Sequence, residues 1–349
     1  MAVTAETLRH VRDLRRKLLR LTDEQTVALT RAWVNAWDAL LPDFEAAVAE
    51  LVAKAVDGKV PYSVVIKNVR LREALAEARA ALDVLAPQVA ETVSAGLTEA
   101  VFDAVDAHAA IIQSQLPPPG TTVGVSVSFS RVPREALQAL VDRTAETIHS
   151  TAIPLAADVE QEMKRALVRG IAVGDNPRRT AARLIKATGS RFNGGLARAL
   201  NISRTETLDA YRAATKLSEQ ANTSILKGWE WSAQLDARTC PSCWAQHGGV
   251  HPLDEDGPLD HQQGRCARVT LTKSWKELGF DIPEPPSASP DARKVFDNLH
   301  PSTQAQIMGA KRLELLQQGK ISWDDLSTKR TTGGWRDSFG VTPLKDLGG

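Results

Sequence analysis

Aromatic residues are scarce in this 349-residue sequence, and so are cysteines and long apolar runs. Aromatic side chains make up 5% of the chain, whereas alanine is abundant in its first 220 residues. Few aromatic residues, few β-branched runs and much alanine favour helices over sheets. Hydrophobic residues make up 43% of the chain, which is enough for a buried core. At about 150 residues per domain, the length allows two or three domains.

Neither sign of charge is in excess. Lysine and arginine number 43, aspartate and glutamate number 42, and the net charge is +1. A histone-like nucleic-acid coat or a polybasic membrane binder needs excess positive charge, so the balance argues against both. No stretch of about 18 apolar residues is free of charges, and we expect no membrane-spanning helix. No apolar segment follows the basic N-terminal stretch, so a secretory signal is not expected.

The three cysteines, Cys240, Cys243 and Cys266, lie within 27 consecutive residues. An odd number in one cluster cannot form a disulfide framework, and it favours a metal site in a reducing compartment. The Cys-x-x-Cys spacing puts two thiolates on one turn, and His261 and Cys266 are spaced as a second ligand pair. We therefore predict a structural Zn²⁺ bound by three thiolates and one imidazole, with no open position for catalysis. The predicted ligands are Cys240, Cys243, His261 and Cys266.

Other interpretations of this region stay open. His247 or His251 could replace His261 as the nitrogen ligand. A Cys-x-x-Cys pair can also be a redox centre, but the chain shows no parallel β-α-β pattern to house one. A zinc deaminase needs His-x-Glu and a zincin needs His-Glu-x-x-His, and neither occurs. The sequence also contains no phosphate-binding loop and no nucleophile elbow.

The apolar patterning predicts a mainly α protein, with long helices in two helical regions, a small β-containing zinc-binding module and a short helical tail. Pro42 is expected to start a new helix, and Pro87 is expected to break another. The predicted segments are an N-terminal helical region at 1–116, a Pro/Gly linker with a candidate strand at 117–132, a central helical domain at 133–225, the Cys₃His zinc module at 226–272, and a C-terminal tail with short helices at 273–349.

Basic residues gather on the first predicted helix, at about residues 5–21. Such a face is often simply solvated, but it can also dock an acidic partner or nucleic acid. The residues concerned are Arg9, Arg12, Arg15, Arg16, Lys17 and Arg20.

An ordered series of motifs runs from the last long helix to the third cysteine. Over about residues 175–275, this series resembles the phage Mu F-like head morphogenesis family, the minor head proteins of tailed phages. In that family the series ends in His-Pro-x-Cys-Arg-Cys, whereas Gly264 here replaces the first of the paired cysteines. If the family uses that cysteine as a metal ligand, the site here must use Cys266 or lose a ligand. The motifs are Asn201-Ile-Ser-Arg204-Thr205-Glu206, Trp229 and Trp231, Asp236-Ala-Arg238-Thr239-Cys240, Gly248-Gly249-Val250, His261, and Arg265-Cys266.

The resemblance implies a minor capsid protein of a tailed phage or prophage, and no enzymatic activity. Such a protein associates with the portal protein inside the head and assists head assembly or DNA delivery. Scaffold, major capsid protein and packaged DNA are further expected partners, and a membrane is not. The expected location is the virion head, and the host cytoplasm during assembly. The basic first helix is the candidate contact surface. A zinc-containing nucleic-acid-binding protein and a thiol or effector enzyme are the alternatives.

Overall fold

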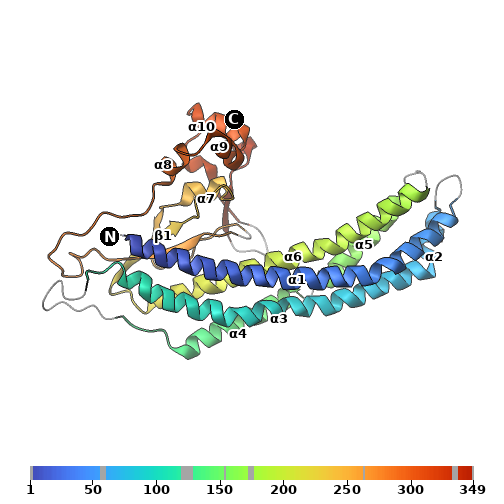
Figure 1. Ribbon diagram of the computed structural model, residues 1–349, viewed down its shortest axis with the longest axis horizontal. Helices are drawn as coiled ribbons and strands as arrows, with labels where there is room; N and C mark the ends of the chain where they lie inside the picture. The colour runs from blue at the N-terminus through green and yellow to red at the C-terminus, as the bar shows by residue number, and fades with distance from the viewer. Residues whose placement is uncertain are drawn as a thin grey trace. The chain divides into compact units, whose positions relative to one another are not determined.

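The computed structural model describes residues 3–55, 60–118, 129–152, 155–171, 177–261, 264–331 and 337–347. The chain forms two compact units, each assembled from segments that are distant in sequence. Figure 1 shows the helices and strands in colours that follow the residue number. Unit 1 combines Met1–Leu19, Glu99–Leu140 and Leu208–Gly349, and unit 2 combines Arg20–Thr98 and Val141–Thr207. No helix in the described part of the chain is both long enough and apolar enough to cross a membrane. The five-segment division made from the sequence stays a prediction.

Helices make up most of the described chain, which confirms the mainly α class. Six of them precede the sheet: α1 (Ala5–Ala53), α2 (Tyr62–Lys67), α3 (Val69–Gln113), α4 (Arg134–Ala152), α5 (Leu155–Ile171) and α6 (Pro177–Gln220). A short helix, α7 (Pro241–Gln246), lies between the first two strands of the sheet, and three more follow the sheet: α8 (Ala292–Asp297), α9 (Pro301–Met308) and α10 (Ala310–Gln317). The candidate strand of the 117–132 linker falls mainly on 119–128, which lie outside the described residues.

The two proline breaks predicted from the sequence are wrong. Pro42 lies inside α1 and Pro87 lies inside α3. A proline within a helix removes one hydrogen bond and costs about 3 kcal/mol. Both helices are packed next to the proline, since Phe44 and Val89 are completely buried. Burial of about two such side chains offsets a local cost of this size.

The core of unit 2 includes the tryptophans of α1. Trp33 is completely buried, and its indole N–H donates to the carbonyl of Phe192 on α6 at 3.3 Å. The ring of Trp37 lies 5.7 Å from that of Phe44 and 5.4 Å from that of Phe192, measured between centroids. These aromatic contacts fix α1 against α6 within the unit.

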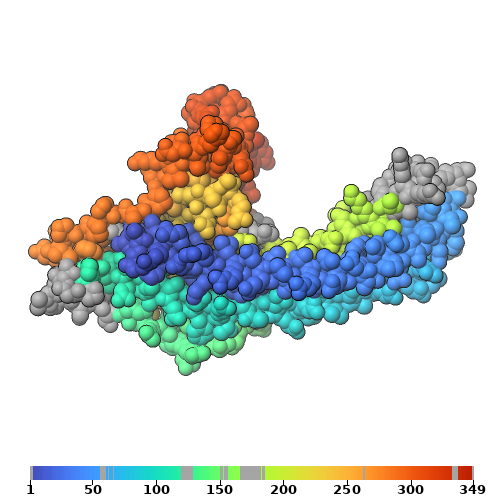
Figure 2. All heavy atoms as spheres, viewed as in Figure 1, coloured from blue at the N-terminus to red at the C-terminus, as the bar shows by residue number. Residues whose placement is uncertain are grey.

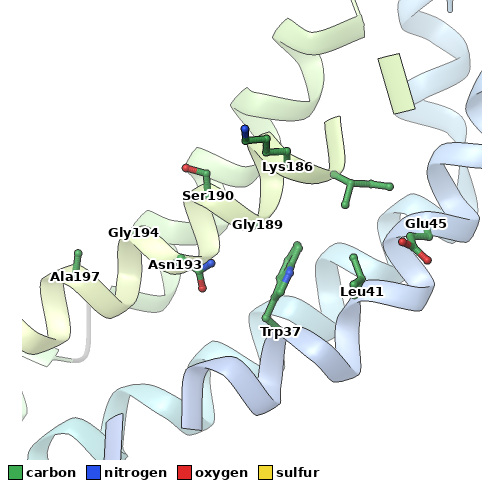
Figure 3. Close-up of a pocket in the computed structure, with 10 residues that line it drawn as sticks. Trp37, Leu41, Glu45, Lys186, Gly189, Ser190, Asn193, Gly194 and Ala197 are labelled. Carbon is green, nitrogen blue, oxygen red and sulfur yellow. The ribbon is translucent and has the colours of Figure 1, made fainter. Parts of the chain in front are cut away.

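A shallow groove of about 730 Å³ lies between α1 and α6 in unit 2 (Figure 3). Trp37, Leu41 and Glu45 line it from α1, and α6 lines it with both long and small residues, among them Lys186 and Gly189. A Cβ added at Gly189 would lie 2.7 Å from the Trp37 ring. Since glycine alone leaves room for this ring, Gly189 allows the two helices to approach closely.

Unit 1 contains a three-stranded antiparallel sheet in the order β2-β1-β3. Its strands are β1 (Leu226–Ser232), β2 (Val250–His251) and β3 (Ala267–Thr272), and every residue of β3 is buried. Trp229 of β1 pairs with His251 on one side and with Thr270 on the other. β3 packs against the helices of this unit, since Ala267 lies in one buried cluster with Val11 of α1 and Ile111 of α3.

The C-terminal tail shares a small core with α7 in unit 1. Trp244 of α7 and Phe296 of α8 meet edge to face, with ring centroids 5.7 Å apart. Leu315 and Leu316 of α10 belong to the same buried cluster. The strands β4 (Ser327–Arg330) and β5 (Ser338–Val341) form a hairpin beside it, followed by the short 3₁₀ turn Leu344–Asp346. The short helices therefore pack onto the module that carries the cysteines.

A buried ion pair joins β3 to the end of α6 in unit 1. The guanidinium of Arg268 is 1% exposed, the carboxylate of Glu219 is 0% exposed, and their closest N–O distance is 2.7 Å. Arg268 also lies over the ring of Trp229, 4.4 Å from its centroid. Its two terminal amino groups also donate to the carbonyls of Leu253 and Glu255. One side chain thus fixes a helix end, a strand and a loop.

His108 of α3 lies beside this ion pair. One ring nitrogen is 2.7 Å from the hydroxyl of Ser218, and the other is 2.8 Å from that of Thr270. Burial, reinforced by the positive charge of Arg268, lowers the pKa of His108 from 6.5 to about 3. The folded protein therefore keeps this imidazole neutral at pH values where the unfolded chain protonates it.

This difference in pKa predicts a loss of stability in mild acid. Below pH 6.5 the unfolded state binds a proton at His108, whereas the folded state binds this proton only when the pH falls to about 3. The contribution of His108 to the free energy of unfolding is therefore complete above pH 6.5. It falls by about 1.4 kcal/mol for each pH unit below that value. Urea unfolding at pH 7.5, 6.5 and 5.5 measures it as the difference between the wild type and His108→Gln.

The difference isolates His108, because loss of metal in acid would affect both proteins alike. Exposed His149 provides the matched control, since His149→Gln should follow the wild type at every pH. A His108→Gln variant with the same pH dependence as the wild type would contradict the burial of a neutral imidazole.

Candidate metal centre

The cysteine pair lies at the start of α7, where a tight turn leads the chain into the helix. The carboxylate of Asp236 accepts hydrogen bonds from the backbone N–H of Arg238 at 3.0 Å and from the hydroxyl of Thr239 at 2.9 Å. Cys240 then caps α7, and its sulfur accepts a hydrogen bond from the N–H of Cys243 at 3.5 Å. Pro241 fits the first helical position, where no N–H is needed. Both thiols are therefore fixed by local structure.

Three of the four predicted ligands come together. One ligand atom each from Cys240, Cys243 and His261 lies within 4.8 Å of the others, and this group could hold a metal ion. Hydrogen bonds from Cys243 and then from His261 lower the pKa of the Cys240 thiol in spite of burial, which favours the thiolate that metals bind. Two sulfurs and one imidazole form the donor set that Zn²⁺ prefers. The residues present fit that ion.

Cys266, the fourth predicted ligand, lies next to Cys243. It is 5% exposed and belongs to the buried cluster that contains Cys243, Trp229 and Trp231. Hydrogen bonds to Cys240 and to Cys266, together with burial, raise the pKa of the Cys243 thiol. The backbone of Cys266 is held on both sides, since its N–H donates to Asp260 at 3.2 Å and its carbonyl accepts from Arg212 at 2.9 Å.

The two alternative histidines are engaged elsewhere. One ring nitrogen of His247 accepts the N–H of Ala233 at 2.9 Å, and the other lies 3.1 Å from the carbonyl of Pro290. His251 stacks on Trp229 with ring centroids 4.2 Å apart. Its Nδ1 lies 3.0 Å from the carboxylate of Glu255. Among the described residues, the group that could hold a metal ion contains His261 and neither His247 nor His251.

An ion pair links the two segments that carry the cysteines. The spacing of the cysteines alone does not indicate it. Arg265 donates to both carboxylate oxygens of Asp236, at 2.6 and 2.8 Å. This bidentate contact lowers the pKa of Asp236 to about 2. It connects the turn before Cys240 to the residue before Cys266, so each sulfur-bearing segment supports the other.

Packing explains why position 264 is glycine in this chain, which departs there from the pattern of the family it resembles. A Cβ at this position would lie 2.0 Å from an oxygen of the Asp260 carboxylate. Asp260 is 1% exposed, and this oxygen accepts from the guanidinium of Arg212 at 2.9 Å. No side chain fits between them, and position 264 cannot supply a ligand here. Sequence reasoning missed Arg212 and Asp260, although Asp260 stands directly before His261.

Adding one methyl group at this point is expected to damage the site. In Gly264→Ala, the new Cβ displaces Asp260 and with it the contacts to Arg212 and Cys266. We expect the affinity for Zn²⁺ to fall about 10-fold or more, because groups that orient metal ligands have effects of this size. Overpacking should also cost about 1–3 kcal/mol of stability. Competition with a chromophoric chelator and thermal unfolding measure the two effects.

Gly194→Ala provides the matched control for this prediction. A Cβ at Gly194 meets nothing within 4 Å, and alanine suits its position in α6. This variant should bind zinc as the wild type does. Equal zinc affinity for Gly264→Ala and Gly194→Ala would contradict the tight packing around Asp260.

The basic face of the first helix is partly occupied by contacts within unit 1. Arg9 pairs with Glu6 at 2.7 Å, Lys17 pairs with Asp103 at 2.8 Å, and Arg16 pairs with Asp13. In the space-filling view, atoms of the first turns of α1, in dark blue, lie on the surface (Figure 2). These pairs favour the solvated-face interpretation, and docking of this helix to an acidic partner stays a prediction.

Residues 161–268 match the family model described as Phage Mu protein F like protein. The matched segment is about a third of the chain and contains all four predicted ligands. The resemblance predicted from the sequence is thereby confirmed over this segment. No curated protein and no solved structure matches the chain.

Proposed function

We propose that this Mu F-like chain is a head morphogenesis protein of a tailed phage or prophage, a structural component of the virion rather than an enzyme. One observation carries the proposal: the matched segment, 161–268, contains the whole cysteine-histidine cluster and ends at Arg268. The polar groups of the segment form internal contacts. Arg268 binds Glu219, and Arg265 binds Asp236. Because these polar groups stabilise the fold of the segment, they support a structural role.

The proposed metal is a structural Zn²⁺ held by Cys240, Cys243, His261 and Cys266. Three of these ligand atoms already lie within 4.8 Å of one another, and the thiol of Cys266 interacts with that of Cys243. When bound, the ion supplies folding free energy, because four protein ligands leave no position for water or substrate. The ligands come from the N-cap and first turn of α7, from the loop before β3, and from the residue that precedes β3. The ion would therefore hold together segments that have little regular structure of their own.

We further propose that the protein associates with the portal protein inside the head. Scaffold, major capsid protein and packaged DNA are additional candidate partners, and the role is in head assembly or DNA delivery. The support for these partners is the match to the Mu F-like family. In this role the protein is present in the virion and, during assembly, in the host cytoplasm.

Co-expression with the portal protein of the same genome tests this proposal. We expect the two proteins to elute together in size-exclusion chromatography, and zinc to elute with them.

A variant with Arg9, Arg12 and Arg16 changed to serine tests the basic face of α1. If this face is the contact, we expect the variant to elute apart from the portal protein. Separate elution of a folded, zinc-bound wild type would contradict portal association. Salt-dependent DNA binding by that protein would then favour a nucleic-acid-binding role.

A further inference from the structure

An apolar stripe of α1 is exposed in unit 2. Val27 and Val34 are 56% and 46% exposed, and Leu41, seven residues further on, is half-buried. Seven residues make about two helical turns, so these three side chains lie along one side of the helix. Trp37 lies in the same stripe, three residues after Val34, and it is also half-buried. Apolar residues at alternating intervals of three and four are typical of a helix that packs against another helix.

The stripe lies beside the buried face of α1. Trp33 and Leu40 are 0% and 6% exposed, and each directly precedes a residue of the stripe. Successive residues of a helix point about 100° apart, so the stripe faces to one side of the core. Trp37 and Leu41 also line the groove between α1 and α6, so the stripe and the groove are continuous (Figure 3). We call this part of unit 2 the groove surface, and it consists of Val27, Val34, Trp37 and Leu41 of α1 with Ser190, Gly194 and Ala197 of α6.

The α6 wall of the groove offers room for a further helix. Ser190, Gly194 and Ala197 line it, and all three are exposed. A Cβ added at Gly194 would meet nothing within 4 Å in the described structure. The neighbouring Gly195 lies against Trp33, since its Cβ would be 3.4 Å from the indole nitrogen. Gly194 is therefore level with the middle of the apolar stripe, where small side chains allow the axis of another helix to approach closely.

Charged residues flank the stripe at the same spacing of seven. Glu24, Arg31 and Asp38 are exposed, and none of them forms an ion pair with another described residue. In a pair of helices, charges beside the apolar contact determine which partner binds and in which direction. Lys186 and Glu45 lie on opposite walls of the groove (Figure 3). The groove surface therefore offers both signs of charge to a partner.

We propose that the groove surface binds the same surface of a second copy of this chain, with the two α1 helices antiparallel. A twofold axis midway between Arg31 and Asp38 places each of these residues opposite the other in the second copy. Glu24 of the second copy then lies level with Glu45, where Lys186 on the opposite wall compensates the two carboxylates. A parallel pair would instead place like charges at the same level. Contact between identical surfaces closes as a dimer. The inference does not depend on the metal centre, and it goes beyond the proposed function.

Sedimentation equilibrium of the full-length protein tests the interface. We expect the wild type to form a dimer. Val34→Asp and Gly194→Leu should each raise the Kd of the dimer about 30-fold or more, because they put a charge or bulk at the centre of the contact. The monomer should tolerate both, since Val34 is exposed and the space around Gly194 is open. Val84→Asp is the matched control, because Val84 is 61% exposed on α3 of the same unit, and this variant should stay dimeric.

Mixing two charge variants tests the antiparallel register. Arg31→Glu alone puts a glutamate opposite Asp38 in both halves of the dimer, and Asp38→Arg alone puts an arginine opposite Arg31. Each variant should therefore bind itself about 10-fold more weakly than the wild type does. An equimolar mixture of the two should form a heterodimer with an affinity close to that of the wild type, because every pair is again of opposite sign. Such a rescue requires contact between two chains, and a change in the fold of one chain cannot produce it.

The other outcomes would overturn the proposal. A wild type that is monomeric at about 100 μM would exclude the dimer. A dimer that persists in both Val34→Asp and Gly194→Leu would show that a different surface joins the copies. Weak self-association of both charge variants without rescue in the mixture would exclude the antiparallel register. A monomeric wild type that binds the portal protein, and loses this binding in Gly194→Leu, would show that the groove surface binds the portal protein instead of a second copy.

Discussion

Replacing Cys243 by serine is expected to abolish zinc binding and to unfold the segment from β1 to β3. Cys243 interacts with both other sulfurs and packs in one buried cluster with Trp229 and Trp231. The binding free energy of a structural zinc, about 10–16 kcal/mol in small zinc domains, is largely folding free energy. Metal content by atomic emission and tryptophan fluorescence measure the loss. Both Trp229 and Trp231 are buried in the folded protein, so their emission should shift to the red.

His251→Gln is the matched control, because His251 lies in the same module but stacks on Trp229 and is not part of the cluster. This variant should keep one zinc per chain. A strong chelator added to the wild type should reproduce the fluorescence change of Cys243→Ser and should have no effect on that variant. A Cys243→Ser protein that stays folded with a full zinc content would disprove the assignment of the site.

Removing the Arg268 guanidinium is expected to have the second largest effect. Arg268→Met leaves the carboxylate of Glu219 buried at 0% exposure without its partner. Breaking a buried pair from one side costs about 3–5 kcal/mol. The change also removes the hydrogen bonds to the carbonyls of Leu253 and Glu255 that hold the loop. Urea unfolding, followed by circular dichroism and fluorescence, should show an earlier transition.

An exposed ion pair provides the control for this result. Arg293 and Asp297 of α8 pair at 2.9 Å with about half of each side chain exposed, and Arg293→Met should cost less than about 1 kcal/mol. The double variant Arg268→Met with Glu219→Leu should recover part of the loss, since no buried charge is then left alone. An Arg268→Met protein as stable as Arg293→Met would contradict the cost of isolating Glu219.

The candidate site could be predicted from the sequence as far as local spacing determines it. Cys240 and Cys243 are three residues apart on one turn, and a turn of that length brings two thiols together in nearly any fold. His261 was predicted from its distance to Cys266, and the cluster contains it. The contacts that orient these residues could not be predicted in the same way. Arg212 and Asp260 are 48 positions apart, and only the folded chain joins them.

The fold shows the same limit. The mainly α class follows from composition and periodicity, which are local properties. The predicted breaks at Pro42 and Pro87 are wrong, because α1 and α3 continue through these prolines and tertiary packing outweighs their local cost. The pairing of Arg268 with Glu219 also depends on tertiary structure, since nothing in the sequence around either residue points to the other.

The interleaving of the two units determines the order in which the chain can fold during synthesis. All of unit 2 has been made once residue 207 has left the ribosome, whereas unit 1 needs segments from both ends of the chain. Val11 and Ile111 lack their packing partner Ala267 until it is translated, more than 250 residues after Val11. Until then the nascent chain carries an uncovered apolar helix face, the kind of surface that chaperones hold. A ribosome-stalled chain that ends before β3 should therefore recruit them, and one that ends after the tail should release them.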